Sequence, residues 1–244
     1  MKDARAATAG RARYAAAVAL AAALTATPFA RDGAAAGARL SAEERAGLAL
    51  LDSIEAAQRT LTDLSARFTE TAFQAVFEES LTSRGEVFFR KPGRLLLRYA
   101  APDSSLLVVN ERTVWLYHVP NRQAHRFRLS EESTAYGLLF GFGGSFRDAR
   151  KHFRFLAEKA ATRHGERVLR AVPIAESPAA EDLEEIVVAI DPKRWLPVRT
   201  RFREKGGDER LFVFEEVRRN PGVREDLFSF TPPEGVEVFD MESE

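Results

Sequence analysis

The four histidines are the side chains best suited to acid–base or metal chemistry: His118, His125, His152 and His164. None lies at the spacing of a two-histidine metal motif such as HExxH, with either another histidine or a carboxylate. The sequence contains no cysteine, which excludes thiol catalysis, zinc–cysteine centres and disulfide bonds. The histidines are therefore interpreted as surface or strand residues, and we expect no metal.

Motifs for a nucleophile or a bound phosphate are also missing from the sequence. No serine lies in the GxSxG pattern of a nucleophile elbow. The glycine-rich stretch Gly141-Phe142-Gly143-Gly144 lacks the GK[ST] ending of a phosphate-binding loop. The acidic pair Glu184-Glu185 is adjacent, so on a strand the two carboxylates would point to opposite faces. We expect a protein that is not an enzyme and that needs no cofactor.

Charge gives no indication of a nucleic-acid partner. The 244 residues include 36 Lys and Arg and 36 Asp and Glu, so the formal net charge is 0. A protein that binds nucleic acid through bulk electrostatics carries an excess of positive charge. The arginines mostly alternate with apolar residues along predicted strands, which is typical of a solvated outer face.

The N-terminal segment has the pattern of an export signal. Basic residues between Lys2 and Arg13 precede an apolar run at 14–26, and small residues at 34–38 offer cleavage sites. The alternative is an N-terminal membrane anchor, but the run is short for a span of about 20 residues and consists mostly of alanine. We expect residues 1–38 to be a signal peptide and leader, and residues 39–244 to form one domain in the periplasm. The absence of cysteine also removes the usual site of a lipid anchor.

The stretch 85–117 is organised as short apolar strands separated by turns. The turn signals are Lys91-Pro92-Gly93, Ala101-Pro102-Asp103 and Asn110-Glu111-Arg112. Between them lie runs of Val, Leu, Phe, Tyr and Trp, which are residues that favour strands. These features predict an antiparallel sheet.

The alternation of side chains in this stretch predicts one solvated and one apolar face. In the run 94–99, Leu95, Leu97 and Tyr99 fall on one face, while Leu96 falls between two arginines on the other. The residues expected on the apolar face of the whole sheet are Val87, Phe89, Leu95, Leu97, Tyr99, Trp115, Tyr117, Phe127 and Leu129. Two interpretations stay open: an ordinary packed core, or a partly unfilled cavity for a hydrophobic ligand.

Helices are few in the predicted fold. Ser41-x-x-Glu44 is a capping box that begins a helix, and Leu48, Leu51 and Ile54 follow along one side of it. Between strands, the glycine-interrupted segment 130–146 predicts a short helical lid with the apolar residues Leu138, Leu139, Phe140 and Phe142. Further strands are predicted at 61–77, 123–129, 153–156, 167–174, 184–190, 196–202 and 210–214.

The predicted fold class is mainly β (α+β): a single strongly curved antiparallel sheet that forms an unclosed barrel capped by the lid. No repeat and no linker divides the chain after the leader.

Four stretches of the chain resemble one known family. They are FRKPGRLLLRYAAPDSSLLVVNERTVWLYHV, FSFTPPEGVEV at the C-terminus, DPKRWLPV at 191–198 and LTDLSARFTET at 61–71, which resembles the family's entry from helix into strand. They occur in the order found in the LolA family of periplasmic lipoprotein carriers, and the resemblance spans about 48–238. It implies an unclosed barrel with a helical lid over a hydrophobic cavity. It also implies a soluble, monomeric carrier of acylated lipoproteins, which takes them from an inner-membrane ABC-type release complex to an outer-membrane acceptor.

One position departs from the family pattern. The family commonly has Arg before the first turn proline, where it holds the lid; here the residue is Lys91, our candidate for the lid latch. Leu95 stands where family members often carry an aromatic residue. The main alternative function is a periplasmic sensor or regulator of lipids or lipoproteins on the same fold. An enzyme would need a clustered acid–base or nucleophile set that the sequence does not show.

Overall fold

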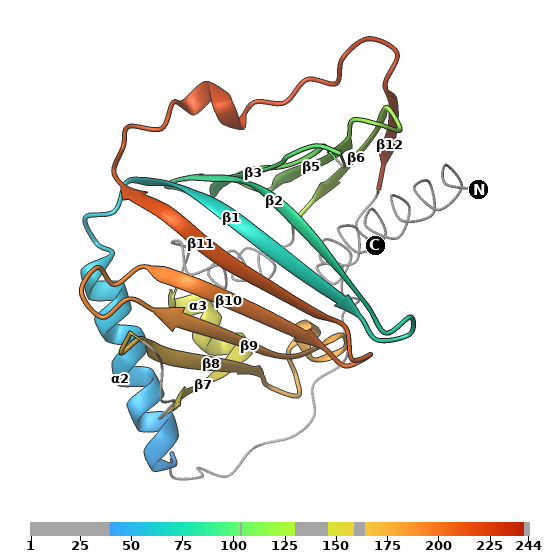
Figure 1. The fold of residues 1–244 in the computed structure, drawn as a ribbon. Helices are drawn as coiled ribbons and strands as arrows, with labels where there is room; N and C mark the ends of the chain where they lie inside the picture. Colours follow the sequence, from blue (N-terminus) through green and yellow to red (C-terminus); the bar gives the residue numbers. More distant parts are fainter. Residues whose placement is uncertain (1–39, 103, 130–145, 159–163, 242–244) are drawn as a thin grey trace.

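Twelve strands form one sheet in the computed structural model, which describes residues 40–102, 104–129, 146–158 and 164–241 (Figure 1). The predicted signal peptide and the predicted lid residues Leu138, Leu139, Phe140 and Phe142 lie outside the described residues. The strands are β1 (Asp63–Gln74), β2 (Glu79–Arg90), β3 (Arg94–Tyr99), β4 (Ser105–Asn110), β5 (Thr113–His118), β6 (Gln123–Arg128), β7 (Phe153–Glu158), β8 (Arg167–Pro173), β9 (Leu183–Ile190), β10 (Pro197–Glu204), β11 (Glu209–Arg219) and β12 (Glu237–Asp240).

The sheet has the order β12-β6-β5-β4-β3-β2-β1-β11-β10-β9-β8-β7. Its two edges, β12 and β7, do not pair with each other, so the curled sheet is not closed into a barrel. All pairs are antiparallel except β12 with β6, which is parallel. The predicted mainly β class with one curved, unclosed sheet is therefore confirmed, with the addition of one short parallel strand at the C-terminus, while the lid stays a prediction.

Helix α2 (Ala42–Ala57) lies against β7 and β8. The predicted capping box begins it: Ser41 Oγ accepts a hydrogen bond from the Glu44 N–H, and the Glu44 carboxylate accepts one from the Ser41 N–H. A side chain at Gly47 would collide with the carbonyl oxygen of Phe155, so glycine lets the helix lie directly on the backbone of β7. Of the three residues predicted along one side of this helix, Leu51 and Ile54 are buried and Leu48 is partly buried against the same core.

A second, shorter helix, α3 (Phe146–His152), leads into β7. Two single 3₁₀ turns complete the described elements, η2 (Pro178–Ala180) and η3 (Glu225–Phe228). No helix among the described residues is both long enough and apolar enough to cross a membrane.

The concave face of the sheet carries the main hydrophobic core. Phe68, Phe202, Phe212 and Phe214 are buried there with aliphatic side chains from β1, β2, β9 and α2. A side chain at Gly85 would collide with the ring of Phe68. Glycine in the middle of β2 therefore allows the Phe68 ring to cross the strand, in line with the strong curl of the sheet at this point.

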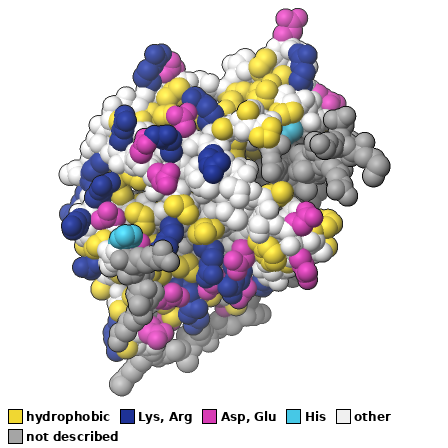
Figure 2. All heavy atoms as spheres, in the orientation of Figure 1, with side chains coloured by type: hydrophobic (Ala, Val, Ile, Leu, Met, Phe, Trp, Pro, Cys, Tyr) yellow, Lys and Arg dark blue, Asp and Glu magenta, His cyan; other side chains and the backbone are white. Residues whose placement is uncertain are grey.

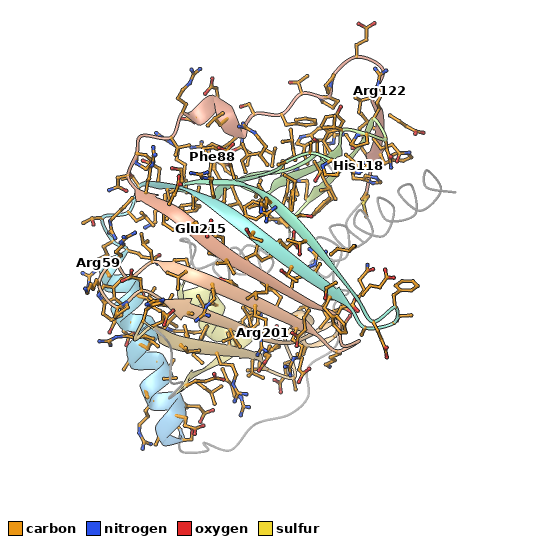
Figure 3. All side chains as sticks on the ribbon, viewed as in Figure 1. Arg59, Phe88, His118, Arg122, Arg201 and Glu215 are labelled. Atoms are coloured by element: carbon orange, nitrogen blue, oxygen red, sulfur yellow. The ribbon has the colours of Figure 1, made fainter. Side chains whose placement is uncertain are left out.

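The convex face of β2–β6 is covered by the segment 220–236, which we call the C-terminal strap (Figure 1). The strap leaves the end of β11, crosses the outside of the sheet through η3 and ends in β12 beside β6. Figure 3 shows Phe88 on the side of the sheet that faces the strap. The β2–β6 half of the sheet is therefore apolar on both faces, and the strap covers its convex face.

Candidate functional site

The concave face of β2–β6 is the candidate site, and the strand register decides which residues belong to it. Directly paired residues of antiparallel strands point to the same face. Val87 pairs with Leu97, and Phe89 pairs with Leu95, on the face that carries the main core. Tyr99 lies on the same face, where its ring meets the ring of Phe68 edge-on, with the two centroids 5.1 Å apart. The structure thus brings these five predicted residues together.

The concave apolar face continues across β4, β5 and β6. Leu95 pairs with Val109, Val109 with Val114, and Val114 with Phe127. Phe127 and Leu129, two further predicted residues, are buried with Val114 in a second cluster. The half-buried side chain of Leu107 packs against both clusters and so joins the second one to the main core, while Val109 packs against the second cluster. Seven of the nine predicted residues therefore share one apolar surface.

Trp115 and Tyr117 correct the prediction, because they lie on the convex face. Trp115 pairs with Val108 and Tyr117 with Leu106, both of which face the strap. The ring of Phe230 in the strap lies 5.4 Å from Trp115 and 5.3 Å from Tyr117 between centroids. The two residues share a face as expected, but the apolar residues of β5 that face inward are Val114 and Leu116.

The prediction for Leu96 was also wrong, because its face of the sheet is covered and not solvated. It was assigned to a solvated face between two arginines, yet its relative exposure is only 2%. It packs with Val108, Val223 and Phe228 under the strap. Strand alternation gave the correct face for Leu96, but it could not show that a segment more than 120 residues later in the sequence, beginning at Asn220, covers that face.

A buried polar group interrupts the concave face near the end of β1. The carboxylate of Glu70 and the guanidinium of Arg210 lie 3.7 Å apart, and each side chain is 8% exposed. Burial raises the pKa of the Tyr99 hydroxyl well above its ordinary value, and the neighbouring Glu70 carboxylate raises it further. Burial also raises the pKa of Glu204, although Arg210 opposes this. Tyr99 therefore stays protonated and can donate a hydrogen bond to Glu70.

Sequence reasoning missed this polar group, although a signal was present. Glu70 lies two positions after the inward-facing Phe68 on β1, and Arg210 lies two positions before the inward-facing Phe212 on β11. A charged residue in phase with buried residues on each of two neighbouring strands indicates a buried ion pair.

Lys91 contacts the C-terminal end of helix α2. Its ammonium group donates a hydrogen bond to the carbonyl oxygen of Gln58, at 2.8 Å, and Arg219 donates to the carbonyl oxygen of Ala57, at 2.6 Å. Helix α2 has no basic residue in its own last turn, so two cations, one just after β2 and one in β11, stabilise its negative end. Burial, and secondarily the nearby Arg219, lowers the pKa of Lys91. Whether Lys91 also holds the predicted lid concerns residues outside those described.

Arg90, the neighbour of Lys91, points to the opposite face, as its position on a strand predicts. Its guanidinium donates to the carbonyl oxygen of Val223 in the strap, at 2.7 Å. Asp63 holds the same end of the strap: its Oδ1 accepts hydrogen bonds from the N–H groups of Gly222 and Val223, at 2.8 and 2.9 Å. Burial alone would raise the pKa of Asp63, but these bonds and one from the Thr62 hydroxyl outweigh it and lower the pKa.

The histidines do not converge on a metal site. Among the described residues, no group of three or more His, Asp or Glu side chains is arranged to hold a metal ion. His118 and His125 lie on the neighbouring strands β5 and β6, and burial lowers the pKa of both. His125 stacks on Phe239 of β12, with centroids 4.9 Å apart.

Comparisons with known proteins agree with this geometry. A family model described as "Outer membrane lipoprotein carrier protein LolA" matches residues 59–231. An outer-membrane lipoprotein carrier protein of Nitrosomonas europaea is 27% identical over 175 residues, which cover 71% of this chain and 80% of that protein. One from Cupriavidus necator is 28% identical over 159 residues, covering 64% and 70%.

Among solved structures, a conserved protein of Thermus thermophilus, described as uncharacterized, has a similar fold. The TM-score is 0.50 at 15% sequence identity, and the match covers 80% of this chain and 99% of that one. This likeness concerns the fold alone.

Proposed function

We propose, from the premise that this chain belongs to the LolA family of outer-membrane lipoprotein carrier proteins, that it carries lipoproteins by binding their acyl chains on the concave face of its sheet. As a member of a family of carrier proteins, it is a binding protein and not an enzyme. The family places its working compartment in the periplasm, in agreement with the export signal predicted at the N-terminus.

The observation that carries the proposal is the apolar surface that runs from Val87 to Phe127 across five strands. Its part nearest to α2 is fully buried, whereas Leu95, Leu107 and Val109 are only half-buried. Half-buried apolar side chains on a concave face still have surface to offer to an apolar ligand. The part of the face near β3 and β4 is therefore where we place the acyl chains.

For the cargo to be released, opening of the site must cost free energy that offsets part of the free energy of acyl-chain binding. Transfer of an acyl chain from water to an apolar site contributes about 0.8 kcal/mol per methylene, so a freely open site would hold a whole chain too tightly. The contacts that close this end of the sheet, including the hydrogen bond from Lys91 to α2, are lost if the helix moves. The predicted lid residues Leu138, Leu139, Phe140 and Phe142 would leave the site in the same step. Cargo binding and closure thus compete for the same face.

The finer parts of the function follow the same family reasoning. The carrier acts as a monomer, takes acylated lipoproteins from an inner-membrane ABC-type release complex, and delivers them to an outer-membrane acceptor. No covalent step is involved, because transfer between apolar sites needs only differences in affinity.

The test uses two neighbouring leucines of β4 on opposite faces of the sheet. Leu107 faces the concave site, Leu106 faces the strap, and both are half-buried. In the purified protein, L107Q should lose uptake of a fluorescent acyl-chain probe, while L106Q should retain it. Equal uptake by both variants, or no uptake by the folded wild-type protein, would refute acyl binding on the concave face. Copurification of lipoproteins with the wild-type chain tests the nature of the cargo.

A further inference from the structure

The hairpin between β1 and β2 ends in an exposed apolar tip. Val76 is 85% exposed, Phe77 is 66% exposed and Phe73 is 37% exposed. Val76 and Phe77 are the two most exposed large apolar side chains among the described residues, and they are adjacent in the chain. The hairpin projects beyond the neighbouring strands at the end of the sheet away from α2 (Figure 1). We call residues 73–79 the hairpin tip.

Three backbone N–H groups of the hairpin tip donate hydrogen bonds within the protein. The N–H groups of Phe77 and Glu78 donate to the carbonyl oxygens of Gln74 and Ala75, at 3.2 and 3.4 Å. The N–H of Ala75 donates to Asp208 Oδ1 in the turn between β10 and β11, at 2.8 Å. The tip is thus an ordered turn braced by a neighbouring turn. These backbone donors do not depend on water, which lowers the free-energy cost of moving the tip into an apolar medium.

The charges around the tip are mainly acidic. Glu78 and Glu79 are exposed beside Phe77, and the bracing turn adds Asp208 and one exposed cation, Lys205. In Figure 2, hydrophobic and acidic side chains lie together at this end of the molecule. A surface that presents ammonium groups above apolar material would match this arrangement. A surface rich in anionic groups would be repelled by it.

We propose that the hairpin tip is a membrane-contact site that inserts Val76 and Phe77 into the headgroup–acyl boundary of a zwitterionic bilayer. Glu78 and Glu79 then lie at the level of the headgroup ammonium groups. The tip is a narrow projection with an internally bonded backbone, which suits a fluid interface. Two side chains give weak and reversible binding, so the protein touches the membrane without staying on it. This contact lies at the opposite end of β1 from Lys91 and α2 and is separate from the proposed acyl site.

The test is cosedimentation of the wild-type chain and its variants with vesicles of phosphatidylethanolamine and phosphatidylcholine. The double variant V76S/F77S should bind at least about tenfold more weakly, because two apolar side chains are no longer transferred from water into the bilayer. The matched control is V119S, in the turn between β5 and β6, where Val119 is 41% exposed. This control should bind like the wild type.

Lipid composition provides the second arm of the test. Addition of phosphatidylglycerol should weaken binding of the wild type, and E78Q/E79Q should remove that sensitivity. Unchanged vesicle binding by V76S/F77S would overturn the proposal. So would equal losses in V76S/F77S and V119S, or contact of the tip with a purified protein partner but not with vesicles.

Uptake of the acyl probe in solution separates this inference from the proposed function. V76S/F77S should take up the probe as the wild type does, since the tip lies outside the concave site. Loss of uptake in this variant would assign the tip to the cargo site and overturn its role in membrane contact. Failure of the wild type to take up any probe would refute the proposed function, while vesicle binding would still decide the role of the tip.

Discussion

The two faces of the β2–β6 half of the sheet are both apolar, but they are covered in different ways. The convex face is covered by the C-terminal strap, whose aromatic and aliphatic side chains pack in one cluster, and whose start is fixed by Asp63 and Arg90. The concave face is closed at one end by α2, whose C-terminus is held by two cations from other elements. Elsewhere it keeps half-buried leucines. We infer that the convex closure serves stability and that the concave closure can be opened.

The largest expected effect on stability concerns the buried ion pair between β1 and β11, in the packed part of the concave face. R210M should reduce the free energy of unfolding by about 3–5 kcal/mol, because it leaves the Glu70 carboxylate buried without its counterion. The double variant E70L/R210M should recover most of the loss, since neither charge is then buried. Urea denaturation measures both. A double variant as unstable as R210M would show that the pair itself, and not the unpaired charge, is what the fold requires.

The next largest effect is expected on the convex face. Phe228 of the strap is fully buried against the convex face, so F228A should reduce the free energy of unfolding by about 3 kcal/mol through the lost burial and the cavity left behind. Acyl-probe uptake by the folded variant should be unchanged. Thermal or urea denaturation alongside the uptake assay gives both readouts. A variant that kept its stability but lost uptake would reverse the roles we assign to the two faces.

Asp63 offers a pH-dependent test of the strap. Its pKa is lower in the folded protein than the ordinary value of about 3.9, so its contribution to stability is complete above that value. The contribution is lost as the pH falls through the folded pKa. D63N should weaken the anchoring of Gly222 and Val223 by about 1.5–3 kcal/mol and remove this pH dependence.

Hydrogen exchange of the Val223 amide, followed between pH 6 and pH 3, measures the effect of D63N after correction for intrinsic exchange. Wild-type protection should decline at the acidic end, whereas D63N should be equally weakly protected throughout. The same acid dependence in both proteins would mean that another carboxylate anchors the strap.

The smallest expected effect concerns the end of α2. K91M should destabilise the last turn of the helix by about 1 kcal/mol, because one of its two terminal cations is lost. K91R should retain most of the stabilisation that Lys91 gives to the helix end, because the positive charge is kept. Amide exchange in the last turn of α2 measures this, and acyl-probe uptake should become faster in K91M if closure at this end opposes binding. Slower uptake would argue that Lys91 helps to form the site.

The sequence predicted the sheet well because strand alternation and turn residues are local signals. Lys91-Pro92-Gly93 does separate β2 from β3, and Ala101-Pro102 lies in a turn between β3 and β4. The five predicted residues from Val87 to Tyr99 have the predicted face. The predicted face of Trp115 and Tyr117 was wrong for a non-local reason. Large aromatic residues on an outer face would be exposed to water unless a distant segment covers them, and here Phe230 of the strap does so. Whether a concave apolar face is fully packed or can accept a ligand depends on the unfilled volume beside it. The periodicity of the sequence gives no information on that volume.

The pairing of β1 with β11 joins two halves of the sheet that lie far apart in the sequence. β1–β6 and β7–β11 are each meanders in which every strand pairs with its immediate predecessor, and such local contacts form quickly. One seam joins the two halves, between residues far apart in the sequence such as Phe68 and Phe214. We therefore expect the seam to close after the two meanders have formed, followed by the strap that depends on it. Pulsed amide labelling would contradict this order if β11 gained protection before the hairpin of β1 and β2.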